Sequence, residues 1–493
     1  MAKNDQNTEN TLFKDIVSHA KEYGFVYQSS EIYDGLQAVY DYGPFGAELK
    51  KNIKELWWNT MTRFNDNIVG LDSSIFMHPD TWKASGHIES FNDPMIDNKD
   101  SKKRYRADVL LEDKAASYEK EGNIEKAHAL LAQMGELLTK EDLEGVRNLI
   151  ITEGITCPLS GTSNWTEVRQ FNLMFSTQIG SVADDSSKVY LRPETAQGIF
   201  VNFLNVQKTA RMKIPFGIAQ IGKAFRNEIV ARQFIFRMRE FEQMEMQFFV
   251  RPGEELSWYE QWSEMRMNWH KALGIPEEKL RFHKHEKLAH YANAAVDVEF
   301  EFPFGFKEIE GIHSRTDFDL RSHMEVSRKK IQYFDPEISK NYVPYVVETS
   351  LGCDRLFLML LCNAYKEEIT GEDGNEKKRI YLKFHPAIAP VKAAILPLTK
   401  KDGLPEKAKE IYSMLKLDHN VIYEEAASIG KRYARQDLIG TPFCIAVDHQ
   451  TLEDNTITVR DRDTTEQRRI SMNELAAYIN DACSYKSIFE KLK

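Results

Sequence analysis

The sequence predicts a large α+β domain built on an antiparallel sheet, followed by a smaller α/β domain. Strand-like runs such as KVYLR, FGIAQIG and DVEFEFPFG are separated by loops and insertions rather than by regular crossover helices, which favours antiparallel pairing. From about residue 387 onward, strand-like and helix-like segments alternate, as in an α/β domain. A chain of 493 residues has room for two or three such domains.

The first hundred residues mix short strands and helices. In DYGPFGAELKKNIKELWW, Pro44 occupies a position that suits the first turn of a helix. The apolar stripe of this helix comprises Leu49, Ile53, Leu56 and Trp57. By default such a stripe belongs to a protein core. From about residue 100 to 150 the chain becomes charged, Ala/Leu-rich and helical in pattern, which indicates an insertion into the surrounding domain.

Strand signals return between residues 157 and 249, and residues 254–295 are helix-like. We expect TDFDLRSH as strand and loop, and YVVETS as a strand that leads through a glycine turn into the apolar helix LGCDRLFLMLLCNAY. The polar tract GEDGNEKKR, residues 371–379, is the best boundary candidate. We therefore expect one domain over residues 1–386 and a second over residues 387–493.

The composition bears on which partners and which cellular compartment suit the protein. A net charge of −10 argues against coating nucleic acid through bulk electrostatics, although local patches could still hold a structured RNA. The polar N-terminus and the short longest apolar run, Leu356–Cys362, predict neither a secretory signal nor a membrane span. Five scattered cysteines without a CxxC pair fit a reducing cytoplasm.

The stretch FRNEIVARQFIFRMREFEQMEMQFF, residues 225–249, mixes core-type residues with charges. Its second half separates into two faces at a period of two. The apolar face comprises Phe236, Met238, Met244, Met246 and Phe248, interrupted by Glu240 and Glu242. The polar face comprises Arg237, Arg239, Phe241, Gln243, Glu245 and Gln247. An aromatic ring among charges of both signs suits a ligand with phosphates, a flat ring and an amine.

Two further arginines support a phosphate-binding site. Arg226 and Glu228 in FRNE share one face if this segment is a strand, and a hairpin through IVARQFI would bring them to the polar face. For any single pair, a cross-strand salt-bridge ladder is the alternative. Arg355 in ETSLGCDRL enters an apolar helix whose N-terminus favours phosphate. A structural ion pair with Glu348 or Asp354 is the alternative for Arg355.

These segments resemble a known family. DYGPFGAELK, FRNE followed by FRMREFEQME, and ETSLGCDR resemble, in order and character, the three signature motifs of class II aminoacyl-tRNA synthetases. The phrases WKASGHIESFNDPMID, YLRPETAQGIFVNF, GIHSRTDFDL and LKFHPAIAPVKAAILPL are similar to those of the single-chain, homodimeric glycyl-tRNA synthetases. The resemblance covers the chain from about residue 11 to its end. It implies a class II antiparallel active-site sheet flanked by helices, with a C-terminal α/β anticodon-binding domain.

The resemblance also implies a reaction. ATP would activate glycine as glycyl-adenylate with release of pyrophosphate, and the glycyl group would pass to the 3′ end of tRNA(Gly). Arg226 would neutralise the α-phosphate and Arg355 would contact the γ-phosphate, while Glu228 meets the adenine amine and Phe241 stacks on adenine. The implied ATP site comprises Arg226, Asn227, Glu228, Phe236, Arg237, Met238, Arg239, Glu240, Phe241, Glu308, Ile309, Gly352, Cys353, Asp354 and Arg355.

Glu308 is the implied ligand of Mg²⁺, because this ion prefers hard oxygen donors. For Glu310 we expect a solvated charge. The implied glycine pocket comprises Arg106, Glu194, Phe241, Glu242, Gln243, Met244, Glu245, Glu348, Thr349, Ser350, Leu351 and Gly352. Several carboxylates in one site would repel each other until a cation binds. Arg315 is a further candidate for the glycine carboxylate, and we expect no editing domain because steric exclusion of larger amino acids suffices.

Other positions remain open. In VRDRDTTEQRR, residues 459–469, either Arg460 or Arg462 is a candidate for RNA contact, with an exposed charged turn as the alternative. We expect a structural role for His87 in ASGHIES. Some relatives carry a cysteine cluster near CPLSGTSNW, whereas Cys157 stands alone here, so we expect no structural zinc.

Three other functions compete. A catalytically dead accessory protein on the same fold should lack the phosphate arginines or pocket acids, which are present. An adenylate-forming enzyme without a tRNA substrate should lack the C-terminal domain. A class II enzyme for another small amino acid is compatible with the three motifs, but the phrases FEQME and RPETAQG favour glycine. We further expect the insertion at residues 100–150 to meet the acceptor stem of tRNA.

Overall fold

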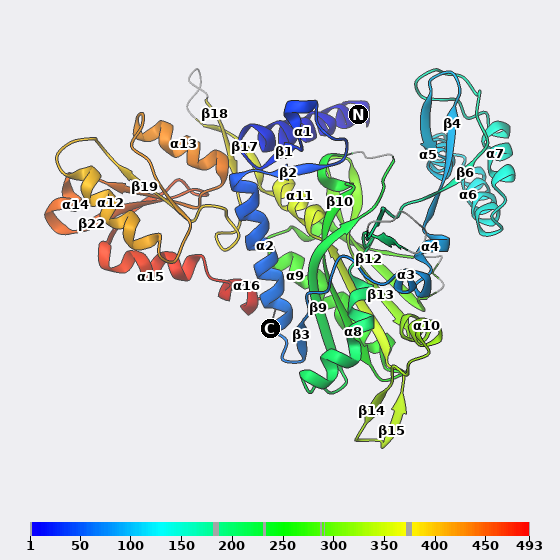
Figure 1. Cartoon of the computed structure of the whole chain (residues 1–493). Coiled ribbons are helices and arrows are strands. Elements are labelled where there is room, and N and C mark those ends of the chain that lie inside the picture. Colours follow the sequence, from blue (N-terminus) through cyan, green and yellow to red (C-terminus); the bar gives the residue numbers. More distant parts are fainter. Residues whose placement is uncertain are drawn as a thin grey trace.

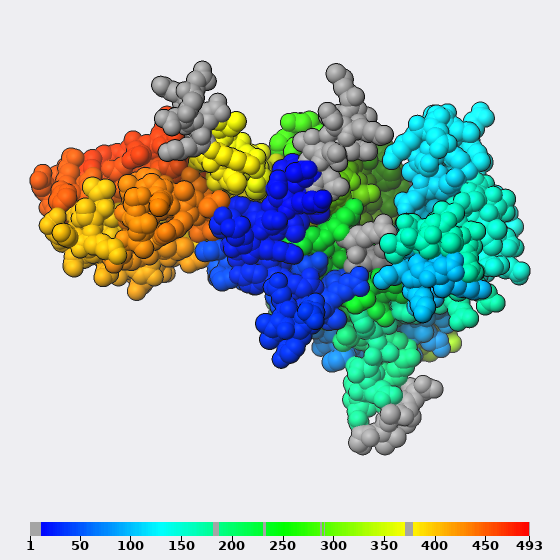
Figure 2. Space-filling model, turned by 90° about the horizontal axis from the view of Figure 1, so that it is seen from above, coloured from blue at the N-terminus to red at the C-terminus, as the bar shows by residue number. Residues whose placement is uncertain are grey.

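The computed structural model describes residues 2–180, 187–229, 233–285, 288–289, 291–370 and 377–492. The central sheet domain lies between the C-terminal domain on one side and the helical insertion on the other (Figure 1), and the view from above shows the same order (Figure 2). The N-terminal helix α1 (Ala2–Glu22) lies over the central part. Among the described residues, no helix is both long and apolar enough to cross a bilayer.

The central sheet has seven strands in the order β11-β12-β13-β16-β10-β9-β3. Their bounds are β3 (Ile68–Gly70), β9 (Phe216–Phe225), β10 (Glu240–Val250), β11 (Leu280–Lys284), β12 (Ala294–Phe302), β13 (Gly305–Thr316) and β16 (Tyr345–Gly352). Every neighbouring pair is antiparallel except β3 with β9. The predicted antiparallel sheet is therefore confirmed.

Helices α2 (Pro44–Thr62), α9 (Glu255–Ala272) and α11 (Cys353–Ala364) pack on one face of this sheet in a single apolar core. Pro44 begins α2, and the expected stripe of that helix is at most 1% exposed, so it belongs to the core of one chain. Helices α8 (Ala196–Thr209) and α10 (Phe318–Ser327) join a second core with Phe216 and Phe249. The polar side chains of β10, β13 and β16 lie beside this second core and form the candidate site.

The insertion has its own hydrophobic core, which runs from Ile96 to Val168. It consists of the sheet β5-β4-β6 and three helices (Figure 1). The bounds are β4 (Asn92–Asn98), β5 (Lys103–Arg106), β6 (Arg169–Asn172), α5 (Ala107–Lys120), α6 (Ile124–Thr139) and α7 (Leu143–Thr152). The compact unit therefore extends beyond the helical residues that composition singles out.

The C-terminal domain is a five-stranded mixed sheet, β20-β19-β21-β22-β23, with helices around it. Its strands are β19 (Ala393–Pro397), β20 (Val421–Tyr423), β21 (Phe443–Val447), β22 (Thr456–Asp461) and β23 (Gln467–Ser471). Its helices are α12 (Leu404–Leu415), α13 (Ile429–Ile439), α14 (His449–Asp454) and α15 (Met472–Ala482). The last helix, α16 (Lys486–Glu490), returns to the central domain, where Phe489 lies 5.3 Å from Phe64 between ring centroids.

The remaining elements are short and connect these bodies. They are β1 (Val26–Gln28), η1 (Glu31–Tyr33), β2 (Tyr40–Tyr42), α3 (Pro79–Ala84), α4 (His87–Ser90), β7 (Ser176–Gln178), β8 (Lys188–Tyr190), η3 (Phe234–Phe236), η4 (Glu277–Lys279), β14 (Tyr333–Asp335) and β15 (Lys340–Tyr342). Strands β17 (Tyr365–Thr370) and β18 (Lys377–Leu382) pair as a hairpin around the boundary tract. Residues 371–376 of that tract lie outside the described residues.

Three local predictions are wrong. TDFDLRSH contributes most of helix α10 rather than strand and loop, and the helix expected over 254–295 ends at Ala272. The strand after FRNE begins at Glu240, because Phe234–Phe236 forms a 3-10 turn whose Phe236 ring packs against Phe302 and Phe304. Strand β9 ends at Phe225, so Arg226 and Glu228 lie just beyond it. Residues 230–232 of the connecting loop are outside the described part.

Candidate active site

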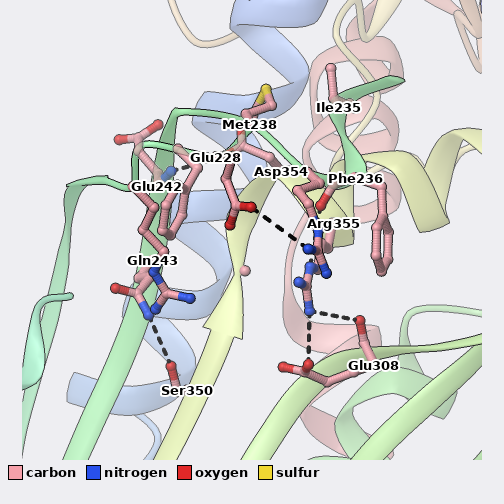
Figure 3. A pocket seen from close by; sticks show the side chains of 14 residues that line it. Glu228, Ile235, Phe236, Met238, Glu242, Gln243, Glu308, Ser350, Asp354 and Arg355 are labelled. Carbon is pink, nitrogen blue, oxygen red and sulfur yellow. Dashed lines mark hydrogen bonds and ion pairs between the residues drawn. The ribbon is translucent and has the colours of Figure 1, made fainter. Parts of the chain in front are cut away.

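A pocket opens where β10, β16 and the start of α11 meet (Figure 3). It encloses about 600 Å³ of space open to solvent. Its lining comprises Arg226, Glu228, Ile235, Phe236, Arg237, Met238, Phe241, Glu242, Gln243, Glu308, Ser350, Gly352, Asp354 and Arg355. The five expected ATP residues that do not line it are Asn227, Arg239, Glu240, Ile309 and Cys353. Ile309 and Cys353 are buried in the core, and Glu240 forms an ion pair with Lys223.

Arg226 is held between two aromatic rings. The centre of its guanidinium lies 5.4 Å from the Phe91 ring centroid and 5.3 Å from that of Phe241. Its Nε donates to the carbonyl of Pro193 over 3.1 Å, which fixes the direction of the group. Burial lowers the pKa of Arg226, and the field of Arg355 lowers it further. The guanidinium is therefore fixed in direction, and burial together with the nearby Arg355 outweighs the attraction of Glu194 and Glu228.

Arg355 lines the same pocket from the first turn of α11, beside Glu308 (Figure 3). Its guanidinium lies 4.5 Å from the centroid of Phe236, and its Nη1 contacts Oε2 of Glu308 at 3.0 Å. The same Nη1 donates to the carbonyl of Glu308 over 3.2 Å. The sequence left open an ion pair with Glu348 or Asp354; the partner is Glu308 instead.

Glu228 is a carboxylate in the lining of the pocket (Figure 3). Its Oε2 is 3.6 Å from Nη1 of Arg237. Arg106, at the end of β5, interacts electrostatically with Glu228, although its closest partners are Asp93 and Asp108. The insertion thus brings Arg106 into the electrostatic field of the pocket residue Glu228 rather than into the acidic cluster that follows.

Three carboxylates, the buried Glu245 and Glu348 and the half-buried Glu194, form an acidic cluster next to this pocket. Glu194 and Glu348 both act electrostatically on Glu245, and Gln247 joins two of the three by donating to Glu245 over 2.8 Å and to Glu348 over 2.7 Å. Register explains the arrangement, because Glu245 pairs with Ser350 and Gln247 with Glu348 on β10 and β16. These side chains therefore project from the same face of the sheet.

The three carboxylates differ in proton affinity. Burial, with repulsion from Glu348 and Glu194, raises the pKa of Glu245 well above its usual range. Burial would also raise the pKa of Glu194, but His87, Arg315 and Gln197 lower it to about 2. For Glu348, contacts with Arg315, His313 and Gln247 outweigh burial and lower the pKa. Glu245 is therefore the carboxylate of the cluster that takes up a proton most readily.

Several residues of this cluster were missed or assigned otherwise from the sequence. His87 was expected to be structural, yet its Nε2 lies 3.4 Å from Oε2 of Glu194 and its Nδ1 lies 2.8 Å from Oγ of Ser85. Gln247 stands on the polar face that the alternation of β10 predicts, but it was not among the residues implied for the glycine pocket. No local signal links His87 to Glu194, since they meet only in the folded chain.

Arg315 is buried inside the cluster. It donates from Nη1 to Oε2 of Glu348 over 2.9 Å, and from Nε and Nη2 to Asp319 over 2.8 and 3.0 Å. Three nitrogens of its guanidinium group thus already donate to protein carboxylates. Arg315 is thus placed to orient Glu348 rather than to take the carboxylate of a ligand.

Four expected pocket residues project elsewhere. Met244 and Leu351 lie in the core, Thr349 is fully buried, and all three have the opposite parity to Glu245 and Glu348 along their strands. The carboxylate of Glu242 is also on that side and binds Lys50 at 2.8 Å and Lys54 at 3.0 Å. Only the backbone of these residues can face the acidic cluster.

Lys50 connects the three motif regions. Its ammonium contacts Glu242 and, at 2.6 Å, the carboxylate of Asp354, which also accepts from Tyr42 and from the backbone N–H of Glu242. Burial by itself would lower the pKa of Lys50, but the combined attraction of Asp354 and the neighbouring negative groups, Glu242 among them, raises it. Asp354 therefore anchors α2 and β10 to α11 and supports the pocket floor.

Two other sequence expectations are corrected. Arg460 and Arg462 are 6% and 1% exposed; Arg460 binds Asp437 at 2.9 Å, and Arg462 donates to the carbonyls of Gly440 and Phe384. Neither faces solvent for RNA contact. Glu310 is buried rather than solvated, and it binds Arg266 at 2.6 Å and His270 at 2.7 Å.

Comparison with known proteins agrees with this geometry. Residues 175–364 match the tRNA synthetase class II core domain (G, H, P, S and T), residues 392–482 match an anticodon binding domain, and residues 93–129 and 121–173 match glycyl-tRNA synthetase insertion domain 1. A glycine–tRNA ligase of Chlorobaculum tepidum is 57% identical over 94% of this chain and 98% of its own length.

Two further relatives are similarly close. The glycine–tRNA ligase of Macrococcus caseolyticus is 52% identical and that of Staphylococcus haemolyticus 51% identical, each over 95% of this chain and 98% of the relative. Identity at this level, over nearly the whole of both chains, includes the sheet, the insertion and the C-terminal domain. The chain belongs to the glycine–tRNA ligase family of class II aminoacyl-tRNA synthetases.

Proposed function

We propose that this chain performs the reaction of its family, ATP-dependent ligation of glycine to tRNA(Gly), with ATP between Arg226 and Arg355 and the glycine ammonium at the acidic cluster. One observation supports this assignment. The guanidinium groups of Arg226 and Arg355 repel each other, and they lie next to the acidic cluster, whose carboxylates also repel each other. A triphosphate relieves the first repulsion and an ammonium relieves the second. Glycine and ATP together supply both charges.

The first step joins a glycine carboxylate oxygen to the α-phosphorus of ATP. The bond from that phosphorus to the bridging oxygen breaks, and pyrophosphate leaves with its electron pair. Arg226 stabilises charge at the α-phosphate and Arg355 holds the far end of the triphosphate. Fixed cationic donors supply positioning and electrostatic stabilisation, so no side chain need act as the nucleophile.

We propose Glu308 as the Mg²⁺ ligand of this site. Its carboxylate lines the pocket, is 47% exposed, and offers the hard oxygen donors that the ion prefers. In the absence of ATP its charge is balanced by Arg355. The bound ion would neutralise phosphate charge, while Arg355 would turn to the triphosphate.

In the second step a ribose hydroxyl at the 3′ end of tRNA(Gly) takes the glycyl group. We propose that the C-terminal domain holds the anticodon and that Arg468 faces the RNA, because it is exposed on β23 and lies 4.3 Å from the Tyr478 ring centroid. Arg468 replaces the buried Arg460 and Arg462 in this role. The insertion, which brings Arg106 into the electrostatic field of Glu228, is the proposed contact of the acceptor stem.

We also propose a homodimer in the cytoplasm. The loop around η1 exposes Ile32, Tyr33 and Leu36 by 87%, 80% and 54%, which is unusual for adjacent large apolar side chains. The same loop accepts hydrogen bonds from Arg239 at Gln37 and Ala38, so a partner chain here would stabilise the edge of the ATP pocket. All five cysteines are free thiols, in keeping with a reducing compartment.

Exchange of labelled pyrophosphate into ATP, measured with Mg²⁺ against glycine, alanine and serine, tests the adenylation site. Exchange with glycine alone supports the assignment, and transfer of labelled glycine to tRNA(Gly) completes it. Exchange that is equal for alanine would overturn the acidic cluster as a glycine-selective pocket. Wild-type exchange in Arg355→Gln would overturn the ATP pocket.

A further inference from the structure

Three potential metal ligands gather on the active-site face of the sheet, beyond the acidic cluster and toward the β11 edge. His285 follows β11, Asp297 is on β12 and His313 is on β13. Their ligand atoms all lie within 4.8 Å of one another. The sheet fixes this spacing, because His313 pairs with Ala295 and the backbone N–H of His285 donates to the carbonyl of the same Ala295.

His313 is oriented as a metal-binding histidine would be. Its Nδ1 lies 2.9 Å from Oε1 of Glu348, a buried carboxylate that can only accept a hydrogen bond while it is ionised. In the neutral imidazole this contact places the proton on Nδ1 and leaves the lone pair on Nε2. A carboxylate behind a ligating histidine is the usual means of fixing its tautomer.

The space between the ligands is kept open by Gly311. A Cβ at this position would lie 3.2 Å from Nε2 of His313 and 3.5 Å from Oδ1 of Asp297, so both atoms border the same space. On its other side, Oδ2 of Asp297 lies 2.8 Å from Nε2 of His285. That nitrogen is buried and, although it lies close to Asp297, it makes no hydrogen bond of regular geometry within the described part of the chain.

A simple His–Asp ion pair does not account for the cluster. His449 and Asp402 form such a pair at 3.1 Å on the surface. The pair of His285 and Asp297 differs from the surface pair in two ways. A third potential ligand, His313, lies beside it, and the carboxylate of Glu348 orients that histidine. Two imidazoles and one carboxylate form a donor set typical of zinc and neighbouring transition metals, whereas Mg²⁺ prefers oxygen.

We infer that His285, Asp297 and His313 bind one divalent transition-metal ion, with Zn²⁺ as the favoured occupant and one coordination position left for water. This site is separate from the proposed Mg²⁺ site at Glu308. The inference departs from the sequence-based expectation of no zinc, which was drawn from the absence of a cysteine cluster around Cys157. Because His313 contacts Glu348, an ion here would fix one wall of the acidic cluster.

The test uses full-length protein treated with a chelator and then titrated with Co²⁺, followed by displacement with Zn²⁺. We expect one Co²⁺ per chain, a visible absorption spectrum typical of nitrogen and oxygen ligands, and bleaching by one equivalent of Zn²⁺. His285→Gln and Asp297→Asn should each weaken Zn²⁺ binding by more than about 100-fold, since loss of an outer partner alone costs about 10–100-fold. Gly311→Ala should weaken it while leaving all three ligands in place.

His449→Gln is the matched control, because it removes a histidine from a His–Asp pair that lacks a third ligand. It should bind Co²⁺ like the wild type. Circular dichroism and the thermal midpoint without metal establish that each variant is folded. Absence of stoichiometric Co²⁺ binding, or binding that persists unchanged in both His285→Gln and Asp297→Asn, would overturn the site.

Discussion

Arg315 donates from Nη1 to Oε2 of Glu348 over 2.9 Å, in a place where both side chains are at most 7% exposed. Two residues 33 positions apart thus form a buried ion pair whose carboxylate also belongs to the acidic cluster. The contact explains how Glu348 keeps its charge in the interior. It also predicts what happens when the pair is broken.

Arg315→Met should destabilise the protein by about 3–5 kcal/mol, because it leaves Glu348 and Asp319 buried without their cation. Urea unfolding followed by fluorescence measures the change. Arg281→Met is the control. The guanidinium of Arg281 is exposed where it pairs with Glu299, and exposed ion pairs contribute only about 0–1 kcal/mol to the free energy of unfolding. Equal effects of the two substitutions would contradict the assignment.

Binding of glycine should release a proton from Glu245. Its folded-state pKa is raised, so the empty cluster is protonated at pH values where a free glutamate is ionised. The ammonium of glycine favours the ionised form, and affinity should therefore rise as the pH increases toward the raised pKa and level off above it. Calorimetry with a non-reactive glycyl-adenylate analogue in buffers of different ionisation enthalpy measures the proton.

Glu245→Gln is the control for this proton. The variant should bind the analogue more weakly and lose both the proton release and the rise in affinity with pH. Proton release that is unchanged in Glu245→Gln would assign the proton to another group.

Arg355→Gln should lower the rate of pyrophosphate exchange by about 100–1,000-fold, the usual cost of removing one fixed donor at a developing charge. Arg321→Gln, which removes an exposed arginine paired with Asp317 on α10, should retain wild-type exchange. Because Arg355 also pairs with Glu308, the thermal midpoint of both variants separates lost catalysis from lost stability. A reduction of less than tenfold in Arg355→Gln would argue against its proposed role.

His87→Gln should raise the KM for glycine more than the KM for ATP. His87 lies 3.4 Å from Glu194, whose pKa it helps to lower, whereas the ATP pocket is lined by other residues. Pyrophosphate exchange at varied glycine and ATP measures the two constants. A matched control is His78→Gln, whose imidazole is 76% exposed. Equal increases in both KM values would indicate a general structural role for His87.

Arg468→Ala should raise the KM for tRNA(Gly) without changing pyrophosphate exchange, because the residue is exposed and far in the chain from the adenylation site. Arg460→Ala should instead destabilise the C-terminal domain, by about 3–5 kcal/mol, since it leaves Asp437 buried with one fewer cation. Aminoacylation kinetics and thermal unfolding distinguish the two. Normal tRNA charging by Arg468→Ala would remove it as an RNA contact.

The sequence by itself determined the antiparallel class of the central sheet, the apolar face of β10, the helix begun by Pro44, and the motif residues Arg226 and Arg355. These features are local, because hydrophobic periodicity and turn residues act over a few neighbouring positions. Gln247 was visible for the same reason. The alternation of period two wrongly predicted strand for the residues just before Glu240. There the Phe236 ring packs against Phe302 and Phe304, which come from a distant part of the chain.

Only the tertiary structure decided which charges meet. Glu242 and Glu245 are three residues apart, yet one binds Lys50 and Lys54 of α2 and the other joins the acidic cluster. Ion pairs depend on distance and burial in space, and a linear pattern carries neither. For the same reason the burial of Arg460 and Arg462, the contact of His87 with Glu194 and the approach of His285 to His313 follow from the packing of distant strands and loops.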